Sequence, residues 1–363
     1  MNRFLKTLSL SAAIALVSGN VVAQERTLNV YNWSDYIDES IISDFTKETG
    51  IKVTYDVFDS NEILETKLLA GGTGYDIVVP SGTFLARQIS AGVFQPLDKS
   101  KLSNLDKMWS TITERTDKYD PGAQYSINYM WGTTGIGYNV AMAKERIGGE
   151  VVSWDTVFDP EQLAKFKDCG VHVLDAPAEI IPAALNYLGK NPDSKDKDDI
   201  AAAEALLEKM RPNVQKFHSS EYINALANGD ICLAVGWSGD VFQARDRASE
   251  ADAGVEVGYA IPKEGALMWF DQMAIPADAR NVEEAHEFLN YIMRPEVIAK
   301  ASNYVYYANG NKESQGLLDK DVLEDPAIYP DEPVLAKTYI TTPYDARTQR
   351  LVTRTWTKVK TGQ

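Results

Sequence analysis

Three short stretches of the sequence place an aromatic side chain within three positions of a carboxylate. They are Trp33-Ser34-Asp35-Tyr36, Trp237-Ser238-Gly239-Asp240 and Trp269-Phe270-Asp271. An aromatic face beside an anionic group suits an organic cation with an apolar stem, because the ring attracts positive charge and covers methylene groups. The recurrence of the pairing indicates a binding site for such a cation.

Structural roles could also explain these residues. Ser34 or Asp35 could cap a following helix, and Glu179 and Asp240 could do the same for their own helices. Trp237 and Trp269 could each belong to a hydrophobic core. Chance capping does not explain why the aromatic and the acid recur together at three strand ends, so we favour a binding site.

The first half of the chain alternates between strand-like and helix-like patterns. Strand-like runs lie at 28–30, 51–57 and 75–79, and helix-like runs lie at 37–49, 62–70 and 84–90. This order predicts a βαβαβ unit with a parallel sheet, in which Gly50 ends the first helix. Ligands bind at the carboxyl ends of such strands. Ser81 follows the third run and is therefore expected beside Trp33.

A second α/β region begins near Gly132. Residues 131–138 are rich in glycine but lack a nucleotide-binding pattern, so we expect a strand that crosses between two lobes. Further strands are expected at 171–174 and 231–235. Glu179 follows the first of these strands, and Trp237 follows the second.

The first 23 residues have the pattern of a secretory signal peptide. Arg3 and Lys6 precede a short apolar run, and Val21-Val22-Ala23 resembles a cleavage site. The chain has 36 basic and 52 acidic residues, and removal of the leader leaves 34 against 52, a net charge of −18. This balance argues against nucleic acid and anionic membranes as partners. The mature length fits two domains, exported and without membrane insertion.

The chain has two cysteines and three histidines. Cys169 and Cys232 do not form a C-x-x-C pair, and the histidines show no metal-binding spacing. In an exported protein two isolated cysteines most simply form one disulfide. We expect no metal and no cofactor.

Six motifs together resemble the periplasmic polyamine-binding proteins of ABC transporters, the putrescine and spermidine receptors. The motifs are Val30-Tyr31-Asn32-Trp33-Ser34-Asp35-Tyr36, Tyr75-Asp76-Ile77-Val78-Val79-Pro80-Ser81, Leu174-Asp175-Ala176-Pro177-Ala178-Glu179, Gly236-Trp237-Ser238-Gly239-Asp240-Val241, Trp269-Phe270-Asp271 and Tyr307-Ala308-Asn309. Each motif is weak alone, but together and in this order they are specific. The resemblance covers essentially the whole mature chain.

The resemblance implies an α/β, two-lobed periplasmic-binding-protein fold of type II. Each lobe would be a mixed, mostly parallel sheet flanked by helices, with the ligand cleft between the lobes. We expect lobe 1 at 24–134 with 260–308, lobe 2 at 135–259 with 309–363, and a bridge between Cys169 and Cys232. The protein would be a periplasmic monomer that delivers its ligand to a membrane permease and catalyses no reaction.

The resemblance also assigns the site residues. An aromatic box would surround the methylene chain of the polyamine, formed by Trp33, Tyr36, Trp237, Trp269 and Tyr307. The ammonium groups would be received by the carboxylates of Asp35, Glu179, Asp240 and Asp271, and they would also donate hydrogen bonds to Ser34 and Ser81. Five positions have the residue types found in the putrescine-preferring members of the family: Ser34, Asp35, Phe84, Ala176 and Asp240. The tryptophan at position 269 is typical of the spermidine receptors, whereas putrescine receptors tend to have phenylalanine there. We therefore expect both ligands to bind.

Other functions remain open from the sequence. Paired carboxylates among aromatic residues also describe a secreted glycosidase cleft. A receptor of the same fold could take another small cationic solute, a sugar or an amino acid. An amino-acid receptor would need an arginine to hold the ligand's carboxylate, and the candidate segments contain none. A partner-binding role without a small ligand is a further alternative.

Overall fold

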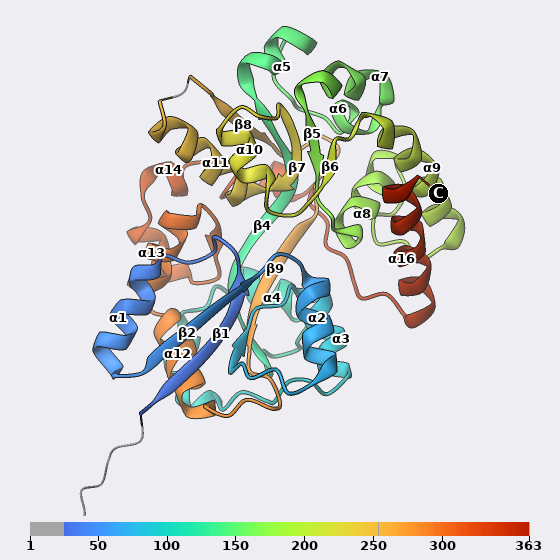
Figure 1. Ribbon diagram of the computed structural model, residues 1–363. Helices are drawn as coiled ribbons and strands as arrows, with labels where there is room; N and C mark the ends of the chain where they lie inside the picture. The colour runs from blue at the N-terminus through green and yellow to red at the C-terminus, as the bar shows by residue number, and fades with distance from the viewer. Residues whose placement is uncertain (1–24, 253, 363) are drawn as a thin grey trace, which may run out of the picture.

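The computed structural model describes residues 25–252 and 254–362, which form two halves joined through their middle (Figure 1). The predicted signal peptide, residues 1–23, lies outside the described residues. Within the described ranges, no helix combines the length and the apolar character needed to cross a bilayer.

The first half begins with the predicted βαβαβ unit. Its strands are β1 (Thr27–Trp33), β2 (Lys52–Phe58) and β3 (Ile77–Val78), and both β2 and β3 pair with β1 in parallel. The helices are α1 (Glu39–Thr49), α2 (Asn61–Ala70) and α3 (Gly82–Ser90). Asp38 caps α1 by accepting a hydrogen bond from the Ser40 amide, and Gly50 ends it with a φ of 74°. The prediction for this unit is confirmed.

One long strand joins the two halves. Strand β4 (Ser126–Asn139) is buried along all of its 14 residues, and it contains the whole glycine-rich stretch 131–138. Its first part pairs with β9 (Met268–Ala274), and its second part pairs with β7 (Leu233–Trp237) and β8 (Val257–Ala260). β4 and β9 run through the middle of the molecule in Figure 1. The predicted crossing strand is therefore present.

All strands of the described residues belong to one mixed sheet of ten strands. Eight of them follow the order β2-β1-β3-β9-β4-β7-β5-β6, and β8 and β10 pair with β4 outside this order. Strands β5 (Val171–Val173) and β6 (Lys216–Phe217) complete the second half, and β10 (Ala308–Asn309) pairs with β4. Parallel pairs lie toward the two ends of this order, whereas every pair made by β4 or β9 is antiparallel.

Helices cover the sheet in both halves. The remaining α-helices are α4 (Ser110–Thr116), α5 (Val140–Ile147), α6 (Asp155–Phe158), α7 (Pro160–Leu163), α8 (Pro177–Tyr187), α9 (Lys197–Met210), α10 (Tyr222–Ala227), α11 (Ser238–Glu250), α12 (Val282–Ile292), α13 (Pro295–Val305), α14 (Lys320–Leu323), α15 (Glu332–Leu335) and α16 (Ala346–Thr361). The 3-10 helices are η1 (Lys99–Lys101), η2 (Leu105–Lys107), η3 (Ala164–Cys169), η4 (Arg211–Asn213) and η5 (Lys312–Leu317).

The buried apolar residues form two separate cores. The first core draws on residues from Leu28 to Trp131 and again from Met268 to Ile328, with Phe242 added from α11. The second draws on residues from Ile136 to Ala260 and on Val352, Trp356 and Val359 of α16. A disulfide joins Cys169 to Cys232 beside the second core, with 5.6 Å between their Cα atoms. The predicted disulfide is confirmed.

Candidate functional site

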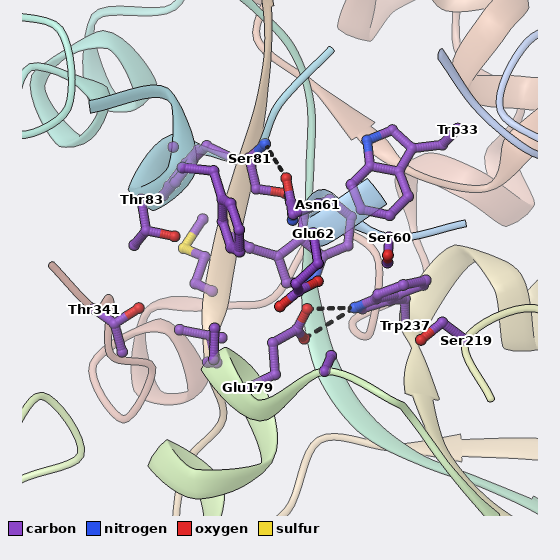
Figure 2. A pocket seen from close by; sticks show the side chains of 18 of the residues that line it. Trp33, Ser60, Asn61, Glu62, Ser81, Thr83, Glu179, Ser219, Trp237 and Thr341 are labelled. Carbon is purple, nitrogen blue, oxygen red and sulfur yellow. Dashed lines mark hydrogen bonds between the residues drawn. The ribbon is translucent and has the colours of Figure 1, made fainter. Parts of the chain in front are cut away.

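Ten of the eleven predicted site residues line one cavity between the two cores. They are Trp33, Ser34, Tyr36, Ser81, Glu179, Trp237, Asp240, Trp269, Asp271 and Tyr307. A second cavity adjoins the first, since the two share Trp33, Ser81, Glu179, Ser219, Trp237 and Trp269. We call the two cavities together the cleft. Figure 2 shows the part of the cleft around Glu62, Glu179 and Trp237.

Aromatic rings from both halves meet around the cleft. The centroids of Trp33, which ends β1, and Trp237, which ends β7, lie 5.5 Å apart with the rings at 74°. Tyr307 lies 5.2 Å from Tyr36 and 5.2 Å from Trp269, again edge to face. Edge-to-face contacts hold the rings in fixed orientations. The cleft therefore has rigid apolar walls.

Asp271 lies on β9 and is held by two hydroxyl groups. Ser81 Oγ donates a hydrogen bond to its Oδ1 at 2.6 Å, and the Tyr36 hydroxyl donates to its Oδ2 at 2.8 Å. Asn61 Nδ2 donates to Ser81 Oγ at 3.0 Å and so fixes that serine. Burial raises the pKa of Asp271 to about 7, although the two hydroxyl donors act in the opposite direction.

Asp240 lies in the first turn of α11, but its carboxylate does not cap that helix. The hydroxyl groups of Tyr222 and Tyr307 each donate a hydrogen bond to it at 2.7 Å. Burial raises the pKa of Asp240 to about 6. The tyrosines therefore orient the carboxylate while leaving it without a counter-ion.

Glu179 is the third predicted carboxylate in the cleft. It lies in the first turn of α8, where Trp237 Nε1 donates to its two oxygens at 3.0 and 2.9 Å and Thr134 Oγ1 donates to Oε2. Burial raises the pKa of Glu179 to about 7. The indole that helps to wall the cleft therefore also fixes this acid (Figure 2).

Asp35 is the one predicted residue that the structure places away from the cleft. It has a φ of 52°, and its carboxylate accepts a hydrogen bond from Arg247 Nη2 at 2.6 Å. This left-handed turn directs Asp35 toward α11 instead of the cavity. Neighbouring Ser34 does line the cavity, where its hydroxyl donates to Asp59 at 3.2 Å.

Several residues of the cleft were not predicted. Asp59 and Glu62 follow the end of β2, and the sequence could have indicated them, because β2 is parallel to β1 and its carboxyl end meets the same edge of the sheet. Ser219 lies in a loop and carries no signal in the sequence. The same holds for Thr134 and Tyr222, which orient Glu179 and Asp240 from behind.

The cleft is electrostatically unbalanced. Among the residues that the structure describes, none of those lining the two cavities is Lys, Arg or His. Asp240, Asp271 and Glu179 form no ion pair within these same residues, whereas many surface acids do. A buried charge without a counter-ion is costly. The arrangement can therefore bind a cation whose charged groups reach these acids and whose apolar part contacts the rings.

Comparisons with known proteins agree with this geometry. Residues 40–330 match the family model of the bacterial extracellular solute-binding proteins. The putrescine-binding periplasmic protein PotF of Escherichia coli (strain K12) is 52% identical over 99% of this chain and 98% of its own length. The putrescine-binding periplasmic protein SpuD of Pseudomonas aeruginosa (strain UCBPP-PA14) is 51% identical over 100% of both chains.

A solved structure of a similar protein has the same fold. The spermidine/putrescine ABC transporter substrate-binding protein PotD from Streptococcus pneumoniae is 30% identical, with a TM-score of 0.76 over 93% of this chain and 99% of that chain. The fold is thus the predicted two-lobed one. The matched family model and the full-length identity to the two relatives lead to one conclusion: this chain belongs to the family of bacterial extracellular solute-binding proteins.

Proposed function

We propose that this protein is a periplasmic receptor that binds putrescine and spermidine and delivers them to an ABC transporter. The observation that carries the proposal is the pairing of buried carboxylates, which have no protein counter-ion in the described cleft, with a wall of aromatic rings. A polyamine supplies what such a cleft lacks, namely separated positive charges on an apolar chain.

The roles of the residues follow from their contacts. Each ammonium group has three donors that need acceptors once they are buried. Asp240, Asp271 and Glu179 each accept hydrogen bonds from the protein and still have oxygen lone pairs for the ligand. The rings of Trp33, Trp237 and the other aromatic residues would cover the methylene groups, with cation–π contacts of about 0.5 to 2 kcal/mol each.

The relatives support both ligands. PotF and SpuD are putrescine-binding by name, and a protein of Salmonella typhimurium that is 33% identical over 93% of this chain is spermidine/putrescine-binding. The relatives and the solved neighbour are binding proteins, which agrees with a receptor that does not transform its ligand. The absence of arginine from the described cleft lining argues against an amino acid as the ligand.

We further propose two lobes that close on the ligand by a hinge at β4 and at the segment between β8 and β9, where the chain passes from one core to the other. The two cores support the expected division except at residue 260, since Ala260 of β8 packs in the second core. We therefore propose 24–134 with 261–308 in lobe 1 and 135–260 in lobe 2. The C-terminal segment is divided, since Leu318, Val322 and Ile328 pack in the first core and Trp356 packs in the second. We therefore assign 309–328 to lobe 1 and α16 to lobe 2, in place of the whole segment 309–363. The receptor would act as a monomer and bind a membrane permease.

Isothermal titration calorimetry tests the proposal. Putrescine and spermidine should each bind with one molecule per chain, and 1,4-butanediol, which has the same length without the charges, should not bind. Mass spectrometry after incubation should recover both amines unchanged. Failure of both amines to bind would refute the proposal, and a product of altered mass would favour an enzyme.

A further inference from the structure

Glu62 is a carboxylate of the cleft that the proposed roles above do not use. It lies in the first turn of α2, a helix whose Leu64 and Leu68 pack in the first core. It lines the same cavity as Glu179, whose helix packs in the second core. Figure 2 shows the two side chains extending toward the same space, and the charge of Glu62 adds to the effect of burial in raising the pKa of Glu179.

The carboxylate of Glu62 has no partner from another described residue. The charge of Arg87 influences Glu62, but the Arg87 guanidinium donates its hydrogen bonds to both oxygens of Glu65 and to Gln349 Oε1. Burial raises the pKa of Glu62 to about 7; the charge of Arg87 acts in the opposite direction, and the charges of Asp175 and Glu65 add to the effect of burial. Glu62 is thus an acid facing another acid, and it forms no ion pair with any residue that the structure describes.

Helix stabilisation does not account for this placement. Ser60 caps α2 and accepts a hydrogen bond from the Ile63 amide, so Glu62 does not occupy the reciprocal position of a capping box. A first-turn glutamate interacts favourably with the helix dipole when it is exposed to water. Burying it beside Glu179 opposes that benefit.

A second polar group in the cleft also lacks a partner. Ser219 is only 6% exposed, lines both cavities, and has a hydroxyl with no hydrogen-bond partner among the described residues. An unsatisfied buried hydroxyl needs an explanation, and a ligand that brings its own donors supplies one. Figure 2 shows Ser219 on the far side of Trp237 from Glu179.

We propose that Glu62 and Glu179 form a second charged end of the cleft, which holds the ammonium group of a triamine such as spermidine that lies farthest from Asp240 and Asp271. Asp240 and Asp271 line only one of the two cavities, Glu62 lines only the other, and Glu179 lines both. A longer cation would therefore reach Glu62, and a short diamine would be held mainly without it. This inference rests on the proposed polyamine function.

Calorimetry on Glu62→Gln tests the inference, with Glu39→Gln as the matched control. Glu39 is also a first-turn glutamate, on α1, but it is exposed and lies outside the cleft. Glu62→Gln should weaken spermidine binding about tenfold or more, which corresponds to about 1.4 kcal/mol, and putrescine binding by less than about threefold. Glu39→Gln should bind both ligands like the unaltered protein.

The outcomes are distinguishable. If the unaltered protein binds neither amine, the proposed function fails. If it binds both, and Glu62→Gln either leaves spermidine unaffected or weakens both amines equally, the second charged end is refuted. Should Glu62→Gln fold poorly by circular dichroism, Glu62→Asp keeps the charge on a shorter side chain. That variant should then lose part of the spermidine affinity and none of the putrescine affinity, and any other result refutes the inference.

Discussion

Arg247 Nη2 donates a hydrogen bond to Asp35 Oδ1 at 2.6 Å and thereby joins α11 to the turn after β1. Gln243 Nε2 adds a bond to the Asp35 carbonyl oxygen at 3.2 Å. α11 follows a strand of the second half, and β1 belongs to the first, so these bonds connect the two halves at the rim of the cleft. The pair is partly exposed, at 35% for Arg247 and 41% for Asp35.

Arg247→Gln should weaken putrescine binding only about two- to fivefold, because an exposed ion pair contributes about 0.2 to 1 kcal/mol. The loss should shrink as salt is added. Asp35→Asn combined with Arg247→Gln should cost little more than either change alone in a double-mutant cycle. Arg146→Gln is the control, since Arg146 pairs with Asp168 within the second half, and it should bind normally. A hundredfold loss in Arg247→Gln would place the arginine in the ligand site instead.

Asp271→Asn should reduce putrescine affinity at pH 8 by about a hundredfold or more, since removing one member of a buried charge pair costs about 3 to 5 kcal/mol. The same change should not destabilise the ligand-free protein through charge. The raised pKa of Asp271, about 7, means that the folded state binds a proton more tightly than the unfolded state. Stability is therefore lost as pH rises from about 4 to 7.

Asparagine has no such loss, so the thermal midpoint of Asp271→Asn relative to the unaltered protein should increase across this pH range. Calorimetric binding and thermal unfolding of the same samples check both parts. Normal binding by Asp271→Asn would show that the ammonium groups lie elsewhere.

Polyamine affinity should rise between about pH 5.5 and pH 8 and then level off. Before a cation binds, burial holds the pKa of Glu179 and Asp271 near 7 and that of Asp240 near 6. An ammonium group favours the ionised acids, so binding should release about one to two protons at pH 6.5. Titrations in buffers of different ionisation enthalpy count these protons, and Asp271→Asn should release fewer. Affinity that does not change with pH would contradict the pKa directions.

Trp269→Phe should lower spermidine affinity more than putrescine affinity. The indole offers a larger face than a phenyl ring, and it packs against Tyr307 and closely approaches Gly132, where a side chain would collide with the ring. Calorimetry with both amines gives the ratio of losses, and Phe84→Leu serves as a variant of another aromatic residue of the cleft. Equal losses, or a larger loss for putrescine, would show that Trp269 does not set the choice.

Reducing the disulfide should destabilise the protein without changing its ligand affinity. The bridge closes a loop with a separation of 63 residues, for which the chain-entropy model gives about 4 kcal/mol. Neither cysteine lines the cleft. The double variant Cys169→Ser/Cys232→Ser should match the reduced protein in its denaturant midpoint and the oxidised protein in putrescine binding. A free thiol in the unfolded, unreduced protein would contradict the bridge.

Local pattern was sufficient to predict much of the fold and site. Strand ends predicted Trp33, which ends β1, and Trp237 and Asp240, which lie at and just after the end of β7. The third aromatic–acid pair also lines the cavity, but its expected place at a strand end was wrong, because Trp269 and Asp271 lie inside β9, which is antiparallel to its neighbours. The same spacing misplaced Asp35, since its orientation depends on a positive φ and on an arginine 212 positions away.

The contacts between the two halves could not be predicted from the sequence patterns. Glu62 and Glu179 line the same cavity because their helices, which pack in different cores, face each other across the cleft. The spacing of apolar residues along either helix does not predict that arrangement. The hydroxyl donors Tyr222 and Thr134 likewise come from a short helix and a crossing strand with no distinctive motif. The division of the C-terminal segment between the two cores could not be predicted for the same reason, because the identity of an apolar residue does not show which core it joins.

The passage of β4 through both halves, and the return of the chain to the first half at β9, also determine the order in which a growing chain can complete its parts. Strand β3 pairs with β1 on one side and with β9 on the other. The first core, which includes Leu28, is therefore incomplete until Phe270 and Phe288 have been synthesised. The second core is likewise incomplete until Trp356 has been synthesised. Neither half can finish folding before nearly the whole chain has been synthesised, and contacts of such long sequence separation form slowly. For the same reason one crossover in the gene could not exchange a whole core, because each core is built from more than one segment of the chain.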